Sequence, residues 1–147
     1  MSEKRLLICG DRNWIDKDKI RECIETIDPD VIIEGEARGA DRMTRDVALE
    51  MGYILGDTLL SFPADWYQYH RAAGPIRNQQ MLDEGQPTIV YAFHGNIRES
   101  KGTKDMIKRS LKAKLPTFWS NGTKIVMVTG TEDWLFEPYT LPDAGGL

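Results

Sequence analysis

Residues 5–14, RLLICGDRNW, carry the signal that decides the fold. An apolar run from Arg5 to Cys9 stops at Gly10, which is typical of a buried strand that ends in a turn. Downstream, four apolar residues recur at helical spacing: Ile20, Cys23, Ile24 and Ile27. Asp16 or Asp18 could cap that helix, and Asp28-Pro29 would end it. This part of the chain therefore predicts a strand, a glycine turn and a helix.

The same alternation continues along the rest of the chain. We expect further strands within residues 31–33, 53–62, 88–93, 116–119 and 124–129, and further helices over 40–51, from Gly74-Pro75 and from Gly102. Residues 63–73 predict an aromatic-rich loop or partial helix. Strands that alternate with helices at this spacing favour a parallel sheet with helices on both faces. The expected fold is α/β: a Rossmann-like, three-layer, doubly wound sandwich whose mainly parallel sheet has five to six strands.

Composition sets the outer limits of the prediction. The chain has 147 residues and a formal net charge of −4. This length suits one domain, and we assign residues 1–130 to it and residues 131–147 to a C-terminal arm or tail. No apolar run approaches the roughly 20 residues of a membrane span, and the N-terminus lacks a secretory apolar region. Two cysteines outside any CxxC pattern indicate a reduced, cytoplasmic setting, and two histidines are too few for a zinc cage.

Three polar loops that contain glycine are expected at one edge of the sheet. They are residues 10–14, 35–42 and 100–103. In an open α/β sheet, ligands bind beyond the carboxyl ends of the strands, where helix N-termini offer N–H groups to anions. Arg12, Arg38 and Arg42 add guanidinium groups that suit phosphate. The sequence has neither GxGxxG, nor a Walker phosphate loop, nor a GxSxG elbow, which argues against ordinary dehydrogenases, Walker-type NTPases and serine hydrolases.

Five motifs in order give the chain a family resemblance. They are GDRNW (10–14), GEARGADR (35–42), PADW (63–66), AAGPIRNQQM (72–81) and SKGT (100–103). Together they resemble the YspA-like (cpYpsA-related) branch of the SLOG superfamily, small Rossmann-like proteins of bacteria and phages. That family is related to the cytokinin-activating LOG phosphoribohydrolases and to DNA-processing protein A. The resemblance implies a nucleotide or nucleotide-derived ligand, held by Gly10, Arg12, Trp14, Gly35, Arg38, Gly39, Asp41, Arg77, Asn78, Ser100, Gly102 and Thr103.

Several of these residues have a second interpretation. Asp41 could accept a ribose hydroxyl or cap its helix. Trp14 and Trp66 could stack on a base or seal the edge of the sheet. Asn78 could read a polar edge of the ligand or buttress a loop. Each alternative is decided by where the side chain lies.

The chain also departs from the family pattern. Asp11 stands where the family usually has serine, and Glu36 where it has glycine. These carboxylates would repel phosphate, unless they bind ribose hydroxyls or hold a divalent metal that bridges to the phosphate. Met106 occupies the place of the glutamate that assists glycosidic cleavage in the phosphoribohydrolases, which weakens the prediction of an enzyme.

Three functions are therefore weighed. The leading one is binding of a nucleotide-like small molecule, with a homo-oligomer expected and no membrane partner. The second is an N-glycosidic hydrolase of nucleoside monophosphates, with Glu36 and Asp41 as weak catalytic candidates beside Asp11. The third is a single-stranded DNA-binding protein that uses the basic run 101–114, which the net negative charge disfavours.

Overall fold

The computed structural model describes residues 3–136. It contains six strands: β1 (Arg5–Gly10), β2 (Val31–Glu34), β3 (Leu59–Ser61), β4 (Ile89–Phe93), β5 (Thr117–Ser120) and β6 (Ile125–Met127). Six α-helices accompany them: α1 (Lys17–Ile27), α2 (Ala40–Glu50), α3 (Trp66–Tyr69), α4 (Ala73–Gly85), α5 (Gly102–Lys112) and α6 (Asp133–Phe136). Two short 3₁₀ turns, η1 (His70–Ala72) and η2 (Ile97–Glu99), complete the set.

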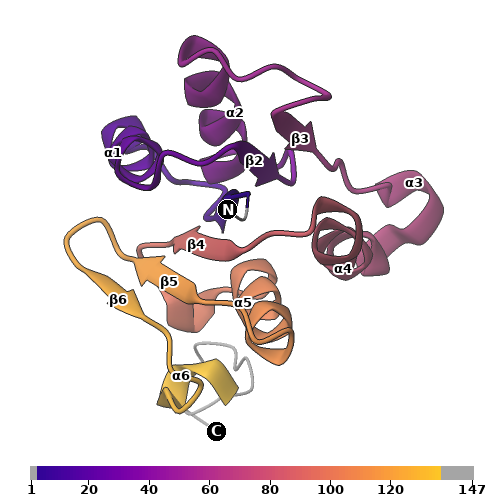
Figure 1. The fold of residues 1–147 in the computed structure, drawn as a ribbon. Helices are drawn as coiled ribbons and strands as arrows, with labels where there is room; N and C mark the ends of the chain where they lie inside the picture. Colours follow the sequence, from indigo (N-terminus) through magenta and orange to yellow (C-terminus); the bar gives the residue numbers. More distant parts are fainter. Residues whose placement is uncertain (1–2, 137–147) are drawn as a thin grey trace, which may run out of the picture.

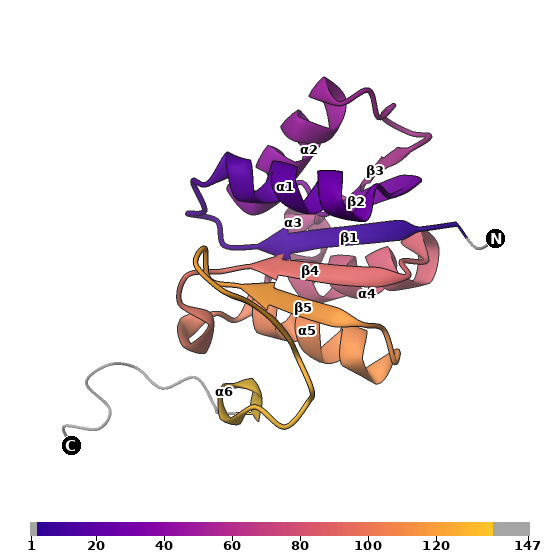
Figure 2. The same ribbon diagram turned by 60° about the vertical axis from the view of Figure 1, so that its left-hand side comes forward.

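One six-stranded sheet organises the molecule, in the order β3-β2-β1-β4-β5-β6. The first five strands are parallel, and their carboxyl ends lie on the same side (Figure 2). The chain order reverses between β1 and β4, which is the point where doubly wound folds bind their ligands. The predicted fold class, an α/β Rossmann-like three-layer sandwich with a mainly parallel sheet, is confirmed.

Helices lie on both faces of the sheet, and the central strand is buried between them. α1 and α2 lie on one face, and α4 and α5 lie on the other (Figure 1). The residues of β1 alternate between the two sides: Leu6 and Ile8 join the core under α1 and α2, while Leu7 and Cys9 join the core under α4 and α5. Because this central strand is buried on both sides, it appears in the sequence as a continuous apolar run.

Local signals set the ends of the first helix. The Asp16 carboxylate accepts a hydrogen bond from the Lys19 N–H, which makes Asp16 and not Asp18 the N-cap. At the other end Asp28 adopts a left-handed conformation, and its N–H bonds the Ile24 carbonyl. The aromatic stretch 63–73 forms one turn of α-helix, α3, followed by η1.

The sixth strand runs against the other five. Only residues 121–124 separate β5 from β6, which is too short for a crossover and forces a hairpin. Asn121 stabilises the turn, because its Oδ1 accepts hydrogen bonds from the N–H groups of Thr123 and Lys124. β6 is shorter than the predicted strand 124–129, and all three of its residues are exposed.

The beginning of the C-terminal arm packs on the domain. Trp134 and Leu135 of α6 are buried in the core on the α5 side, and Trp134 lies 5.3 Å from Trp119 between ring centroids. The prediction for the remainder of the arm, residues 137–147, lies outside the described residues. None of the helices within residues 3–136 combines the length and hydropathy needed to cross a membrane.

Candidate functional site

Two of the predicted loops pack against each other at the carboxyl edge. The Ala40 N–H donates to the Asp11 carbonyl over 3.0 Å, which joins loop 35–42 to loop 10–14. Gly39 makes this approach possible: its φ is +83°, and a Cβ there would lie 2.2 Å from the Asp11 carbonyl oxygen. Gly10 likewise lies against β4, where a Cβ would come within 2.1 Å of the Phe93 carbonyl oxygen. Both glycines are required by backbone contact.

An arginine-rich cavity of about 650 Å³ opens beside these loops. It is lined by Arg12, Gly35, Glu36, Ala37, Arg38, Arg42, Pro63, Ala64, Trp66 and Arg77. Four guanidinium groups thus converge from three separate parts of the chain: the loop after β1, the segment from the β2–α2 loop into α2, and helix α4. We call this site the arginine cavity.

Arg77 fixes the floor of the arginine cavity. Its Nη1 donates to the Gly35 carbonyl, and its Nε donates to Asn78 Oδ1 over 3.1 Å. A Cβ at Gly35 would lie 2.6 Å from Arg77 Nη1, so only glycine lets the guanidinium reach this position undisturbed. The first glycine of GEARG, Gly35, is therefore required because the Arg77 side chain occupies the space that a Cβ would fill.

Asp41 lies behind Gly35 and Ala37, two residues of the cavity lining, and is not itself part of that lining. The residue is 5% exposed, and its Oδ2 accepts a hydrogen bond of 3.2 Å from the Ala37 N–H. Its Oδ1 is buried and has no hydrogen-bond partner among residues 3–136. Burial raises the pKa of Asp41 to about 6, although Arg77 and the Ala37 N–H act in the opposite direction. Asp41 therefore holds its own loop and keeps one acceptor oxygen unused.

Glu34 is a buried acid that the sequence analysis missed. It ends β2 with no exposed surface. Its Oε1 accepts from the Glu36 N–H over 2.5 Å, and its Oε2 accepts from the Ser61 hydroxyl. Burial raises the pKa of Glu34 to about 7. The sequence did contain a signal for this buried acid, because a charged residue at the end of the apolar run VIIE needs a hydrogen-bond partner nearby. The signal was missed because an apolar strand followed by Gly35 accounts for the run without assigning any role to Glu34.

Glu36 lines the arginine cavity in a conformation that favours glycine. Its φ is +59°, which explains physically why a glycine is expected at this position. Its Oε1 accepts an ion-paired hydrogen bond of 2.7 Å from Arg45 Nη1 on α2. The repulsion of phosphate predicted for Glu36 is therefore partly offset by a neighbouring cation.

Trp66 and Arg12 form the aromatic side of the arginine cavity. Trp66 begins α3 and is 48% exposed, and the Arg12 guanidinium lies 5.9 Å from the centre of its ring. Such a cation–π contact orients both groups and leaves ring surface open to a planar ligand. Of the two roles predicted for Trp66, stacking on a base and sealing the edge of the sheet, its place in the cavity lining favours the first.

Trp14 lies in the core and does not line the arginine cavity. It is 7% exposed, its ring lies 5.5 Å from that of Phe93, and its Nε1 donates to the Asp16 carbonyl. The role expected from the resemblance, contact with the ligand, is not what this position offers. Trp14 instead anchors the loop after β1.

Loop 100–103 is closed by its own hydrogen bonds. The Ser100 Oγ accepts from the N–H groups of Thr103 and Lys104 and so caps α5. Ser100 and Thr103 are buried, and a Cβ at Gly102 would meet nothing within 4 Å. The structure places Ser100, Gly102 and Thr103 away from the lining of the arginine cavity. The free N–H groups expected at this helix end are thus partly occupied.

Asn78 buttresses the frame between α4 and α5. Its Nδ2 donates to Asp105 Oδ2 over 2.9 Å, and Asp105 also accepts from Arg109 Nε over 2.8 Å. Two cations of the basic run are likewise used internally, because Lys104 Nζ donates to the Arg98 carbonyl and Arg109 pairs with Asp105. These contacts reduce the charge that the run can offer to a nucleic acid.

Asp11 faces the end of β4. Its Oδ1 accepts from the Asn13 N–H and lies 3.9 Å from His94 Nε2. His94 Nδ1 accepts from the Asn96 N–H, so the neutral ring carries its proton on the side of Asp11. Burial lowers the pKa of His94. Within residues 3–136, no cluster of three or more His, Cys, Asp or Glu side chains is arranged to hold a metal ion.

Comparisons with protein-family models, with curated proteins and with solved structures found no match to this chain.

Proposed function

We propose that the protein binds a nucleotide or a nucleotide-derived small molecule in the arginine cavity. The observation that carries the proposal is the convergence of Arg12, Arg38, Arg42 and Arg77 on one cavity at the carboxyl edge of the sheet. Guanidinium groups bind phosphate oxygens in pairs of parallel hydrogen bonds, and several of them together suit a ligand with more than one negative charge.

The other parts of such a ligand also have candidate partners. The exposed ring surface of Trp66 suits a nucleobase, because stacking on an aromatic side chain is available to every base. Asp41 keeps a buried Oδ1 without a partner among residues 3–136, but Arg77 fills the space beside Gly35, so a ribose hydroxyl would reach this oxygen only if Arg77 moved. In this arrangement side chains, and not helix N–H groups, carry the phosphate, since Asp11 and Ser100 already occupy N–H groups at the starts of α2 and α5.

The proposal includes membership of the YspA-like branch of the SLOG superfamily. It is supported by the positions of the motifs: GDRNW, GEARGADR, PADW and AAGPIRNQQM each contribute residues to the lining of the arginine cavity. We also propose a cytoplasmic, bacterial or phage setting. Cys9 and Cys23 are buried free thiols, which suits a reducing compartment.

Calorimetric titration tests the binding proposal directly. The titrants are AMP, ATP, ADP-ribose and, as an uncharged probe, adenosine. We expect phosphate-bearing titrants to bind and adenosine to bind at least tenfold more weakly. Arg38→Ala should weaken binding tenfold or more, at a cost of about 1.4 kcal/mol per tenfold. Arg71→Ala, an exposed arginine outside the lining of the cavity, is the matched control and should leave affinity unchanged.

Two results would contradict this proposal. One is the absence of heat and of thermal stabilisation with every phosphate-bearing titrant, for the wild type and for Glu36→Gly. The other is an equal loss of affinity in Arg38→Ala and Arg71→Ala, which would indicate nonspecific attraction by surface charge.

Asp41 favours a second candidate function, cleavage of an N-glycosidic bond. A carboxyl group with a pKa raised to about 6, buried directly behind the lining residues Gly35 and Ala37, suits an acid or a base near neutral pH. Chromatography for free base after incubation with nucleoside monophosphates tests it. Release above background that Asp41→Asn abolishes, while binding persists, would support an enzyme. Release at the background rate would leave the protein as a binding module.

A further inference from the structure

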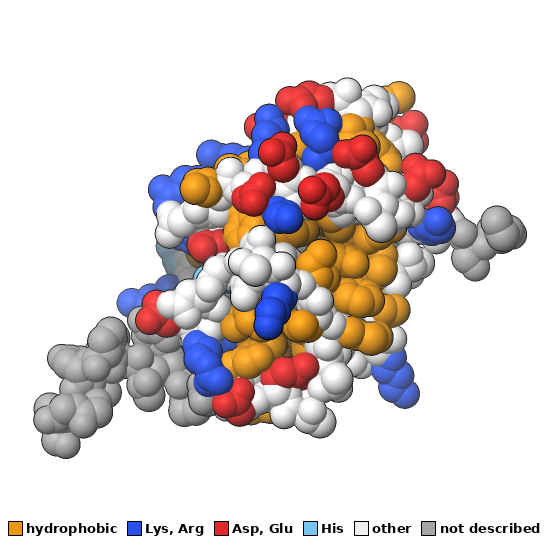
Figure 3. Space-filling model, turned by 90° about the vertical axis from the view of Figure 1, so that its left-hand side faces the viewer, with side chains coloured by type: hydrophobic (Ala, Val, Ile, Leu, Met, Phe, Trp, Pro, Cys, Tyr) orange, Lys and Arg blue, Asp and Glu red, His pale blue; other side chains and the backbone are white. Residues whose placement is uncertain are grey.

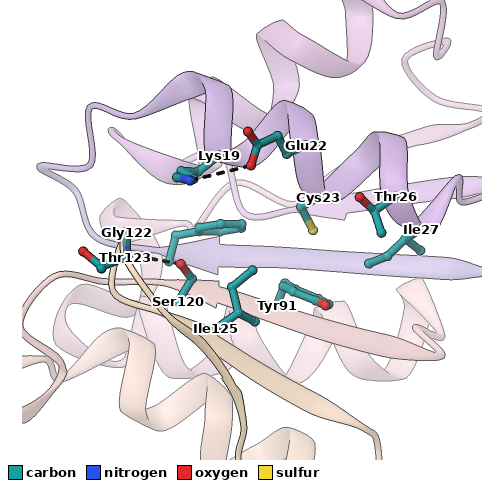
Figure 4. A pocket seen from close by; sticks show the side chains of 11 residues that line it. Lys19, Glu22, Cys23, Thr26, Ile27, Tyr91, Ser120, Gly122, Thr123 and Ile125 are labelled. Atoms are coloured by element: carbon teal, nitrogen blue, oxygen red, sulfur yellow. Dashed lines mark hydrogen bonds and ion pairs between the residues drawn. The ribbon is translucent and has the colours of Figure 1, made fainter.

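The two faces of the sheet differ in their relation to the arginine cavity. On the face of α1 and α2, apolar side chains gather between α1 and the β5–β6 hairpin (Figure 3). A pocket of about 140 Å³ lies there, with Cys23 and Ile27 on one wall and Ile125 on the other (Figure 4), and it shares no lining residue with the arginine cavity. On the other face, polar side chains lie between α4 and α5, and their hydrogen bonds lead to Arg77 in the arginine cavity.

Asn78 is the central residue of this polar contact. It is buried, and its Oδ1 accepts a hydrogen bond of 3.1 Å from Arg77 Nε. At the other end of the same amide, Nδ2 donates to Asp105 Oδ2 over 2.9 Å and to the Gly102 carbonyl over a longer 3.4 Å. One amide group therefore connects the arginine cavity with Asp105 in the first turn of α5.

The orientation of the Asn78 amide determines whether Arg77 is held. Arg77 Nε can only donate and the Asp105 carboxylate can only accept, so the amide must present its oxygen to Arg77 and its NH₂ group to Asp105. An amide turned by 180° would aim its NH₂ group at the Arg77 N–H, and two donors would face each other. Asp105 disfavours this second orientation, because a charged acceptor holds Nδ2 more strongly than the distant Gly102 carbonyl does.

Arg77 is held at two of its three nitrogen atoms. Within residues 3–136 its hydrogen bonds use Nη1, which donates to the Gly35 carbonyl, and Nε, which donates to Asn78, so that Nη2 is left for a ligand. A guanidinium group that is already fixed loses less side-chain freedom when an anion binds, and this preorganisation strengthens binding. The hydrogen bond to Asn78 is therefore expected to raise the affinity of the arginine cavity.

We propose that Asp105 is a positioning residue of the arginine cavity, which acts through the Asn78 amide to hold the Arg77 guanidinium ready for an anion. Asp105 does not line the cavity itself. The inference rests on the proposed function, since it takes the anion to be the phosphate of a nucleotide-like ligand. Its expected sign is distinctive: the removal of a carboxylate makes the chain less negative, which by itself favours an anion, whereas the loss of positioning weakens binding.

One oxygen of Asp105 serves two neighbours, and this provides matched variants. Oδ2 also accepts from Arg109 Nε over 2.8 Å, and Arg109 Nη1 donates to Gln79 Oε1 over 3.0 Å. Asp105→Leu removes the acceptor for both Asn78 and Arg109, whereas Asp105→Asn keeps an amide oxygen in the same place. Arg109→Met removes the ion pair and the bond to Gln79 but leaves the hydrogen bond between Asn78 and Asp105.

NMR of the arginine side chains tests the positioning step without any ligand. The Nε–H signal of Arg77, identified by its absence in Arg77→Lys, reports on the hydrogen bond to Asn78. Asp105→Leu should speed the exchange of this proton with water by about tenfold or more, while Asp105→Asn and Arg109→Met leave it close to the wild-type rate. Equal rates in Asp105→Leu and Arg109→Met would overturn the inference, because Asp105 would then serve only the packing of α4 on α5.

Calorimetry with ATP and with adenosine tests the consequence for binding. Asp105→Leu should weaken ATP by about fivefold or more and leave adenosine unchanged, whereas Asp105→Asn should bind ATP at least as tightly as the wild type. In an Arg77→Met background, Asp105→Leu should no longer weaken ATP, because the side chain that it positions is absent. Circular dichroism establishes that each variant is folded, and Asp105→Ala replaces Asp105→Leu if the larger side chain prevents folding.

The outcomes separate this inference from the proposed function. A wild type that binds ATP together with an Asp105→Leu variant that binds it equally well or more tightly overturns the role of Asp105 and leaves the proposed function standing. A loss of affinity that persists in the Arg77→Met background also overturns it, since the effect would not pass through Arg77. A wild type that binds no phosphate-bearing titrant overturns both.

Discussion

Loops 35–42 and 100–103 look alike in the sequence and do opposite things in the structure. Both are polar, contain glycine and precede a helix at the carboxyl edge. Loop 100–103 satisfies itself, since Ser100 Oγ accepts from the N–H groups of Thr103 and Lys104, and the Gly102 carbonyl accepts from Asn78 Nδ2. Loop 35–42 leaves Asp41 Oδ1 without a partner within the described part of the chain, residues 3–136, and its Arg38 lines the arginine cavity. A loop that keeps unused polar groups is a better candidate for ligand binding than one whose groups are all paired.

The glycines should separate the two loops most strongly. Gly39→Ala forces a Cβ to within 2.2 Å of the Asp11 carbonyl oxygen at φ +83°. We expect a loss of at least about 3 kcal/mol in the free energy of unfolding, from left-handed strain and from overpacking together. Gly102→Ala, with nothing within 4 Å, should cost nothing. Urea denaturation measures both, and equal stabilities would mean that the loops do not differ in this way.

The buried acid under loop 35–42 should produce a pH dependence. The pKa of Glu34 rises from about 4.5 to about 7 on folding, so the native state holds a proton that the unfolded state has lost. Stability should therefore fall as pH rises from about 4.5 to about 7, by up to roughly 3 kcal/mol, and then stay level. Glu34→Gln, which keeps an acceptor for the Glu36 N–H, should remove most of this slope.

Denaturation at a series of pH values measures the effect of Glu34. Exposed Glu25 offers the matched control, and Glu25→Gln should keep the wild-type slope. Asp41, with a pKa raised to about 6, contributes in the same direction, so part of the slope should persist in Glu34→Gln and disappear when Asp41→Asn is added. A slope that survives both substitutions would assign it to other groups.

Removing the cap of loop 100–103 should affect stability and not ligand binding. Ser100→Ala deprives Thr103 and Lys104 of the oxygen that accepts their N–H groups, which typically costs about 1 kcal/mol. Arg38→Ala should weaken ligand binding and leave stability unchanged, because Arg38 is an exposed residue that lines the arginine cavity. Thermal unfolding and calorimetry on the same two variants measure both effects. If Ser100→Ala weakened nucleotide binding as much as Arg38→Ala, both loops would belong to the site.

The sequence predicted the frame of the molecule well because periodicity and glycine turns are local signals. The buried strands, a helix cap at Asp16 or Asp18, and the meeting of Arg12, Arg38 and Arg77 at one edge all follow from such signals and from the topology of doubly wound sheets; the structure assigns the cap to Asp16. The positions of Trp14 and Glu34 did not follow. Whether a tryptophan after a strand turns into the core, and whether an acid finds a hydroxyl on a neighbouring strand, depends on contacts between distant segments.

Glu36 gives the smallest and most discriminating test of the arginine cavity. Glu36→Gly relieves a left-handed φ of +59° and also removes a partly exposed ion pair with Arg45, so the free energy of unfolding should change by less than about 1 kcal/mol. Phosphate-bearing ligands should bind severalfold more tightly, because a carboxylate leaves the lining and Arg45 gains an unpaired charge. Arg45→Ala is the opposite case, since it strands the Glu36 carboxylate beside the arginines, and it should weaken the same ligands. Calorimetry on both variants measures the change in affinity. The two substitutions also change the net charge by one unit in opposite directions, so the titrations are repeated at higher salt, which screens the net charge of the protein more than contacts inside the cavity. Affinities that move the same way in both variants would show that Glu36 does not face the bound anion.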